Sequence, residues 1–289
     1  MLYSGRQFNF KFLVLLILVF TGCRASEKLL LSTWASSGES VFDAPALEPE
    51  SLPFKEDFIW AGTVSHHLLV GDYIDDWFRV ISENRNVKTF FIICPSHYGY
   101  SVHPWSIADV RWDAGAYGKV DCNSEIVNTI IKNLGITQES GVFIPEHGMN
   151  TLIPYVAKYF PDAKIVPIAV HGEPPLDQAL AEKLYTALKP YFDLKGKKDN
   201  FLVLSTDFAH HGNYEGTVFK DNRTRTFFEA PLSGTWICCG CDNRPGVYIL
   251  SKLMSEKTEA RVQYHTNSYD VSGKDENDIT SYFFTFFVN

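Results

Sequence analysis

The sequence predicts a single α/β domain in which helices flank a mainly parallel central sheet. Short apolar runs rich in β-branched and aromatic residues alternate with longer segments of helical periodicity. Four of these runs, at residues 59–64, 87–93, 165–170 and 201–204, are followed within four residues by a histidine or an aspartate. The chain from residue 56 onward, about 235 residues, contains no Pro- and Gly-rich linker. That length is enough for one domain with a full core.

The first predicted elements form a βαβ unit. Residues 59–64 read as an apolar strand, and residues 68–83 place Tyr73, Trp77 and other apolar side chains at helical spacing, so we predict an amphipathic helix packed on the sheet. Residues 87–93, followed by Cys94 and Pro95, have the composition of a buried central strand. The crossover between these two strands should be right-handed.

The middle of the chain is predicted to hold a loop or hairpin followed by two helices. Residues 98–121 are rich in aromatic residues and glycine, which favours loop or hairpin. Asn123 or Ser124 can cap a helix that extends to residue 133 and ends at Gly135. A second helix is expected over residues 149–160, because Pro161 ends its pattern.

The second half continues the alternation of strands and helices. We predict strands at residues 163–170, 201–204, 261–266 and 281–288, and helices at residues 176–191, 222–230 and 245–254. The last strand is strongly aromatic and alternates poorly, which favours a buried strand or a covered edge.

Histidine and aspartate side chains follow several of these strands. His66 follows the strand at 59–64, His97 follows the strand at 87–93, and Asp207 and His210 follow the strand at 201–204. The carboxyl ends of parallel strands meet at one edge of a sheet, where α/β proteins bind ligands. His147 begins the helical segment near residue 149 and should lie close to the same edge. The sequence therefore predicts a shared rim with metal-ligand chemistry.

The N-terminal segment has the pattern of a bacterial lipoprotein signal. Arg6 and Lys11 precede an apolar run at 12–20, and Thr21, Gly22 and Cys23 follow it. The run is shorter than the roughly 20 residues that span a bilayer. We expect residues 1–22 to be a signal peptide, residues 23–55 a lipidated cysteine with a polar tether, and residues 56–289 the folded domain. A plain secretory signal and an uncleaved anchor are the alternatives.

These segments imply a protein that is lipid-anchored in the bacterial cell envelope, with the membrane as a partner through a lipid on Cys23. The chain has 34 acidic and 26 basic residues and a formal net charge of −8, and cleavage before Cys23 would make it more negative. This balance disfavours nucleic acid and anionic lipid surfaces as partners. Five cysteines follow Cys23, so at least one must stay free, bind metal or pair between chains. A disulfide such as one between Cys238 and Cys241 is an alternative to a thiolate ligand.

The chain resembles the Memo family, which includes the bacterial proteins called AmmeMemoRadiSam system protein B. Five motifs occur in the family's order and with matching spacers, over roughly residues 59–287. They are Ser65-His66, Cys94-Pro95-Ser96-His97, Glu146-His147 with Pro154, Ser205-Thr206-Asp207-Phe208 with His210, and Thr280-Ser281-Tyr282-Phe283. The resemblance implies a fold similar to that of the class III extradiol dioxygenases, which are LigB-like proteins.

The resemblance also implies a ligand set of two histidines and one cysteine. The histidines are His66 and His97. The cysteine is Cys241, which keeps the family's spacing to Pro245, or Cys239, which keeps the Cys-Gly dipeptide. Imidazole and thiolate ligands suit a divalent transition metal such as Fe, Cu or Zn, and the sequence leaves the metal open.

Other polar residues are candidates for catalysis or for orienting the ligands. His147 and His210 are candidate acid/base groups, and Asp207 is a candidate for the same work or for orienting a ligating histidine. Glu146 could orient His147 in the same way. His67 is expected to point into the helix–sheet interface, and His171 to lie on the surface.

Three functions are consistent with this site. The first is a metal-dependent oxidoreductase related to the extradiol dioxygenases, acting on an unknown small molecule. The second is a non-catalytic lipoprotein that binds a metal or small ligand, and the third is a zinc-type hydrolase that uses metal-bound water. A carboxylate in place of the cysteine ligand would favour the first, because dioxygenases of this type use two histidines and one carboxylate.

Overall fold

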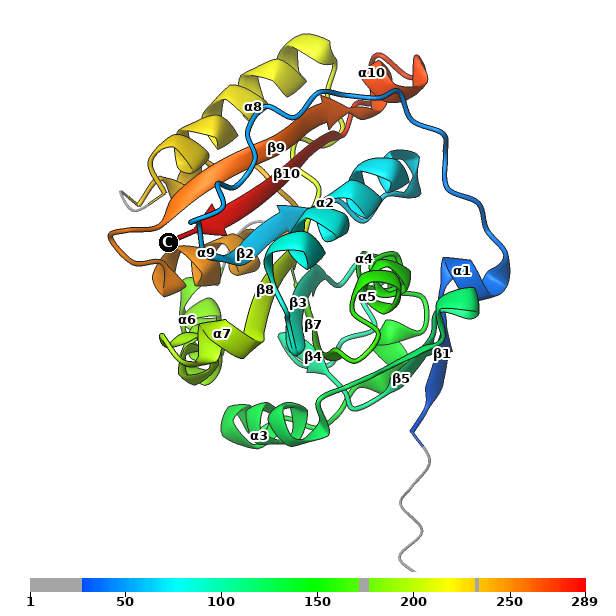
Figure 1. Ribbon diagram of the computed structural model, residues 1–289, viewed down its shortest axis with the longest axis vertical. Coiled ribbons are helices and arrows are strands. Elements are labelled where there is room, and N and C mark those ends of the chain that lie inside the picture. The colour runs from blue at the N-terminus through cyan, green and yellow to red at the C-terminus, as the bar shows by residue number, and fades with distance from the viewer. Residues whose placement is uncertain (1–27, 172–176, 232–233) are drawn as a thin grey trace, which may run out of the picture.

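The computed structural model describes residues 28–171, 177–231 and 234–289, which form two sheets and their surrounding helices (Figure 1). Within these residues the larger sheet has the strand order β4-β7-β3-β8-β2-β10-β9, and the smaller has the order β1-β5-β6. The larger sheet consists of β2 (Ile59–Val64), β3 (Thr89–Pro95), β4 (Trp105–Ile107), β7 (Lys164–Val170), β8 (Asn200–Ser205), β9 (Glu259–Asn267) and β10 (Ser281–Val288). The smaller consists of β1 (Leu30–Ser32), β5 (Arg111–Asp113) and β6 (Lys119–Asp121).

Helices connect most of the strands. The longer ones are α2 (Gly71–Asn84), α3 (Ser124–Leu134), α5 (Ile153–Tyr159), α6 (Gln178–Leu188), α8 (Tyr214–Glu229) and α9 (Arg244–Leu253). The short helices are α1 (Trp34–Ser37), α4 (His147–Asn150), α7 (Gly196–Asp199) and α10 (Ser268–Ser272). Single 3₁₀ turns are η1 (Leu68–Val70), η2 (Gly115–Tyr117), η3 (Ser140–Phe143), η4 (Lys189–Phe192) and η5 (Thr235–Cys238).

The predicted α/β domain with a central sheet is confirmed, and its strand directions are mixed. The central strands β7, β3, β8 and β2 are parallel, whereas β4, β10 and β9 join the sheet antiparallel at its two sides. Every residue of β2, β3 and β8 is buried, as expected when helices cover both faces of a parallel sheet.

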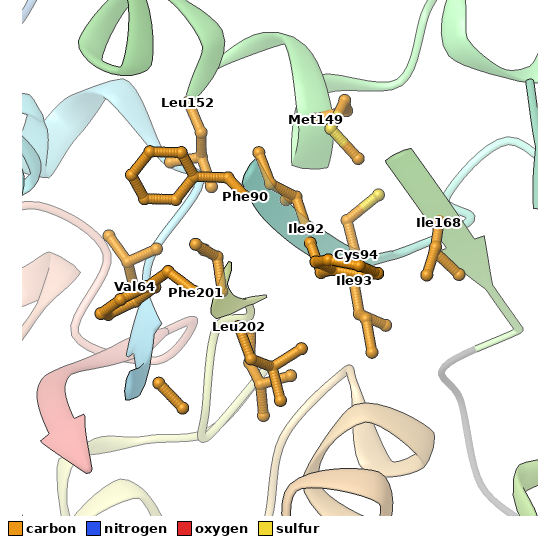
Figure 2. Close-up of a cluster of buried hydrophobic side chains, with 14 of the residues drawn as sticks. Val64, Phe90, Ile92, Ile93, Cys94, Met149, Leu152, Ile168, Phe201 and Leu202 are labelled. Atoms are coloured by element: carbon orange, nitrogen blue, oxygen red, sulfur yellow. The ribbon is translucent and has the colours of Figure 1, made fainter. Parts of the chain in front are cut away.

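Neighbouring phenylalanines of β3 show how the two faces are covered. Phe90 contacts Phe78 of α2 and Phe160 at the end of α5, whereas Phe91 contacts Phe192 of η4. Successive side chains of a strand point to opposite faces, so α2 and α5 lie on one face and the α6–η4 segment on the other. In Figure 2, Ile92 and Cys94 point toward Met149 and Leu152, and Ile93 points away from them.

Helix boundaries follow the capping side chains more closely than the apolar pattern. The side chain of Asn123 accepts from the backbone N–H of Ile126, and Gly135 ends α3 in the left-handed conformation, as predicted. The helix predicted at 149–160 is instead split into α4 and α5, with Pro154 in the first turn of α5. The helix predicted from residue 222 begins at Tyr214, because the side chain of Asn213 caps it. Residue 176, the predicted start of α6, lies outside the described residues.

Part of the segment expected to be a polar tether packs on the domain. Strand β1 pairs in parallel with β5, Leu31 is buried, and the indole of Trp34 donates to the carbonyl of Thr151 at 2.9 Å. The expectation of a tether is therefore wrong for residues 30–37. The predicted signal at 1–22 and Cys23 lie outside the described residues. Across the described ranges, no helix combines the length and the apolar character that crossing a bilayer requires.

Candidate metal site

Three imidazoles come together at the carboxyl ends of the parallel strands. One ring nitrogen from each of His66, His97 and His147 lies within 4.8 Å of the other two. His66 follows β2, His97 follows β3, and His147 begins α4. The structure thus brings together the two histidines predicted as ligands and adds one that was predicted for acid/base work. Such a cluster could hold a single metal ion.

His66 is held in one tautomer by Ser205. The Ser205 hydroxyl donates to the carbonyl of Gly148 at 2.5 Å, so its oxygen accepts from Nδ1–H of His66 at 3.1 Å. Burial, and then the nearby His97 and His147, lower the pKa of His66 to about 3, although Asp242 and Glu146 act in the opposite direction. His66 is therefore neutral at physiological pH, and its Nε2 lone pair is free to bind a metal.

Glu146 orients His97. The sequence had suggested that it orients His147. Glu146 is fully buried, and its Oε1 accepts from Nδ1 of His97 at 2.6 Å while its Oε2 accepts from the backbone N–H of His97 at 2.8 Å. The same carboxylate caps α4 through the N–H of Gly148 at 2.9 Å. A carboxylate that accepts the second ring N–H of a histidine directs the other nitrogen toward the metal position.

The electrostatic environments of the other two imidazoles differ. For His97, burial lowers the pKa, but the nearby carboxylates of Asp242 and Glu146 outweigh it and raise the pKa to about 9. For His147, burial and then the positive charge of His97 lower the pKa. The side chain of His147 is also the most open of the three, with 42% exposed, and its Nδ1 lies 3.2 Å from the hydroxyl of Tyr98.

Two aspartates lie beside the cluster. Oδ2 of Asp207 is 3.7 Å from Nε2 of His66, and its Oδ1 accepts from the hydroxyl of Ser65 at 2.6 Å. Oδ2 of Asp242 lies 3.5 Å from Nε2 of His66, and 3.8 Å from Nε2 of both His97 and His210. Sequence reasoning included Asp207 and His210 but missed Asp242, which follows no strand. The only signal for it was its place between the candidate ligand Cys241 and the start of α9.

The cysteines expected as ligands lie outside the three-histidine group. Cys239 and Cys241 are buried, and the thiol of Cys239 contacts that of Cys241 and the hydroxyl of Thr224 in α8. Burial, and then Cys241, raise the pKa of Cys239 well above its usual value. Each cysteine in the described part of the chain is free, so the disulfide between Cys238 and Cys241 does not form in this structure.

The remaining histidines have separate surroundings. His67 is exposed beside the pocket rather than pointing into the helix–sheet interface, and its Nδ1 lies 3.1 Å from the hydroxyl of the buried Tyr282. His171 is exposed, as expected. His210 lies near Asp242, but its Nε2 is buried and has no hydrogen-bond partner among the described residues.

A pocket of about 440 Å³ leads to the cluster. His66 and His147 lie in its wall, together with Trp34, Leu69 and Ile144. Residues of the N-terminal β1–α1 segment thus form part of the pocket, which sequence reasoning did not anticipate. A volume of this size accommodates a small molecule, and its position allows that molecule to reach the imidazoles.

The fold and the histidine cluster define an α/β protein with a candidate metal site at the rim of its central sheet. A solved structure of an uncharacterised protein from Escherichia coli K12 has the same fold, with a TM-score of 0.51, 9% identity, and coverage of 78% of this chain and 99% of that chain. A family model described as Memo-like protein matches residues 66–282, so the chain belongs to the Memo-like family.

Two relatives are described as MEMO1 family proteins. A MEMO1 family protein of Pyrobaculum arsenaticum is 25% identical over 197 residues, which cover 64% of this chain and 68% of that protein. A MEMO1 family protein of Saccharolobus solfataricus is 24% identical over 228 residues, which cover 75% of each chain. The membership predicted from the five motifs is therefore confirmed.

Proposed function

We propose that this protein binds a divalent transition metal, Fe, Cu or Zn, through His66, His97 and His147, and acts as a metal-dependent oxidoreductase on a small molecule. The observation that carries the proposal is the orientation of the imidazoles. Ser205 and Glu146 accept the Nδ1–H of His66 and His97, which leaves both Nε2 atoms directed at one place. Such orientation is typical of ligating histidines.

The surroundings of the cluster suit this role. When bound, the metal would act as a Lewis acid and could activate oxygen or water. The pocket beside His66 and His147 admits the small molecule, and Trp34 and Leu69 give it an apolar wall. His147 is proposed as a ligand in place of the acid/base role that the sequence suggested, which leaves His210 to hold or move the proton at the reacting atoms and Asp207 to keep Ser65 and the β2 turn in place.

The test is the metal content of the purified full chain, prepared without a His tag and measured by elemental analysis. We expect near-stoichiometric Fe, Cu or Zn in the wild type and less than about one tenth of it in His66→Ala and His97→Ala. His103→Ala is the matched control, because His103 lies outside the cluster beside Thr137. A wild type that stays free of metal after anaerobic reconstitution would contradict the proposal.

Oxygen uptake by the reconstituted protein separates the possible chemistries. Metal-dependent oxygen consumption with small reducing substrates would support the oxidoreductase. Hydrolysis of a generic ester without oxygen uptake would support the zinc-type hydrolase instead, and a bound but inert metal would leave a binding protein.

We also propose that the protein is anchored in the bacterial cell envelope through a lipid on Cys23. The pattern of Arg6, Lys11, the apolar run and Cys23 supports this placement. Cells labelled with radioactive palmitate should incorporate label into the wild type, and Cys23→Ser should abolish the label and release the protein from the membrane fraction. Equal labelling of both proteins would rule out this anchor.

A further inference from the structure

We propose that the carboxylate of Asp242 is the anionic ligand of the metal site, in the role that the sequence assigned to Cys241 or Cys239. This inference rests on the proposed function, because it concerns the same metal. It differs from that function in naming which residue supplies the negative charge.

The distances around Asp242 fit a shared ion. Zinc-like metals lie about 2.0–2.2 Å from nitrogen and oxygen ligands, so two tetrahedral ligands are about 3.4 Å apart. Oδ2 of Asp242 lies 3.5 Å from Nε2 of His66 and 3.8 Å from Nε2 of His97. These separations are too long for good hydrogen bonds and within a few tenths of an ångström of ligand-to-ligand distances.

The two carboxylate oxygens of Asp242 have different surroundings. Oδ1 of Asp242 accepts from the hydroxyl of Thr206 at 2.7 Å and from the N–H of Asp207 at 3.1 Å. Oδ2 is buried and has no hydrogen-bond partner in the described part of the chain, and the same is true of Nε2 of His210, 3.8 Å away. A buried carboxylate oxygen without a partner is costly, and a cation among the facing nitrogens would remove that cost.

The backbone around Asp242 is fixed by Asn243. The side-chain amide of Asn243 donates to the carbonyls of Ile93 and Ser205, at the ends of β3 and β8, and its oxygen caps α9 at Gly246. The N–H of Asp242 in turn donates to the carbonyl of Asp207. Asp242 is thus tied to the same strand ends that carry the histidines, so little ordering is needed when the metal binds.

A carboxylate ligand has a chemical consequence. Imidazole nitrogens and a carboxylate oxygen are the ligand types of the non-haem Fe(II) oxygenases, whereas a thiolate would favour softer metals. Oxygen could oxidise a thiolate ligand, but it would not oxidise a carboxylate. Asp242 as the anionic ligand therefore favours the proposed oxidoreductase function.

The experiment uses Co(II) as the probe, bound anaerobically to the full chain and followed by absorption and titration. A thiolate ligand gives a sulfur-to-cobalt charge-transfer band in the near ultraviolet, and a carboxylate does not. We expect no such band in the wild type, affinity within about threefold of the wild type in the double variant Cys239→Ser, Cys241→Ser, and a new band in Asp242→Cys. Asp242→Asn, whose oxygen can still accept from Thr206 and Asp207, should lower the affinity at least about tenfold.

The outcomes separate this inference from the proposed function. A charge-transfer band in the wild type that disappears in the double cysteine variant would overturn the role of Asp242 and leave the metal site standing. Unchanged affinity in Asp242→Asn, folded as judged by circular dichroism, would overturn it as well. A wild type that binds no Co(II) would overturn both proposals, and the wild type alone reveals that result.

Discussion

Glu146→Gln should lower the metal affinity of the protein by about 10- to 100-fold. Oε1 of Glu146 accepts from Nδ1 of His97 and the N–H of Gly148, and Oε2 accepts from the N–H of His97. Glutamine replaces one oxygen with an NH₂ group, which leaves at least one of these buried donors unpaired and frees the His97 ring to rotate. Titration of the purified variant with Zn(II) against a competing chelator measures the change.

Glu139→Gln is the matched control for this variant. Glu139 is a partly buried carboxylate that, like Glu146, accepts from a backbone N–H, here that of Val102, and it also accepts from the hydroxyl of Ser106. It has no contact with the histidine cluster, so its replacement should reduce stability by a similar amount and leave metal affinity unchanged. Equal losses of affinity in both variants would show that Glu146 acts through general stability and not by orienting His97.

Gly62→Ala should reduce the free energy of unfolding by about 3 kcal/mol, at the upper end of overpacking effects. Gly62 lies in the middle of β2, where the indole of Trp77 passes over it and donates to the carbonyl of Thr285 in β10 at 3.0 Å. A Cβ at residue 62 would overlap that carbonyl oxygen and lie 2.5 Å from Cζ2 of Trp77. Neither a paired strand nor a buried ring that stacks on Phe286 can move without breaking other contacts.

Urea unfolding of Gly62→Ala beside Gly141→Ala measures this effect. A Cβ at residue 141 would meet no atom within 4 Å, so the control should differ from the wild type by less than about 1 kcal/mol. If both variants unfold at the same urea concentration, the sheet tolerates a side chain between β2 and β10 and the close approach of Trp77 is not required.

Sequence reasoning located the elements whose signals are local. Strands β2 and β10 begin and end at the predicted residues, and α3 is bounded by its two capping residues. The same local logic placed His66 and His97 after strands, and parallel strands then bring their ends to one edge. Elements with weaker local signals were missed. Strand β1 has only three residues, so it depends on contacts with distant parts of the chain. Leu31 pairs with β5, and the indole of Trp34 donates to the carbonyl of Thr151, directly after α4.

The anionic group of the site could not be found in this way. Asp242 lies in a loop, and what brings it to the histidines is the pairing of its N–H with the carbonyl of Asp207 and the anchoring of Asn243 to two strands. Those contacts join residues 35 or more positions apart, so no spacing in the sequence reports them. A family motif drew attention instead to Cys241, one residue away, and Cys239, three residues away.

If Cys23 carries the proposed lipid, the packing of the β1–α1 segment against the pocket limits the distance between the site and the membrane. Leu30 begins β1, and Trp34 four residues later lies in the pocket wall. A fully extended chain covers about 3.3–3.6 Å per residue, so the seven residues from Cys23 to Leu30 span at most about 25 Å. A lipid on Cys23 would therefore keep the folded domain, and the pocket in it, close to the bilayer surface. Small molecules that partition into the headgroup region would then reach the site at a higher local concentration than those that remain in bulk solution.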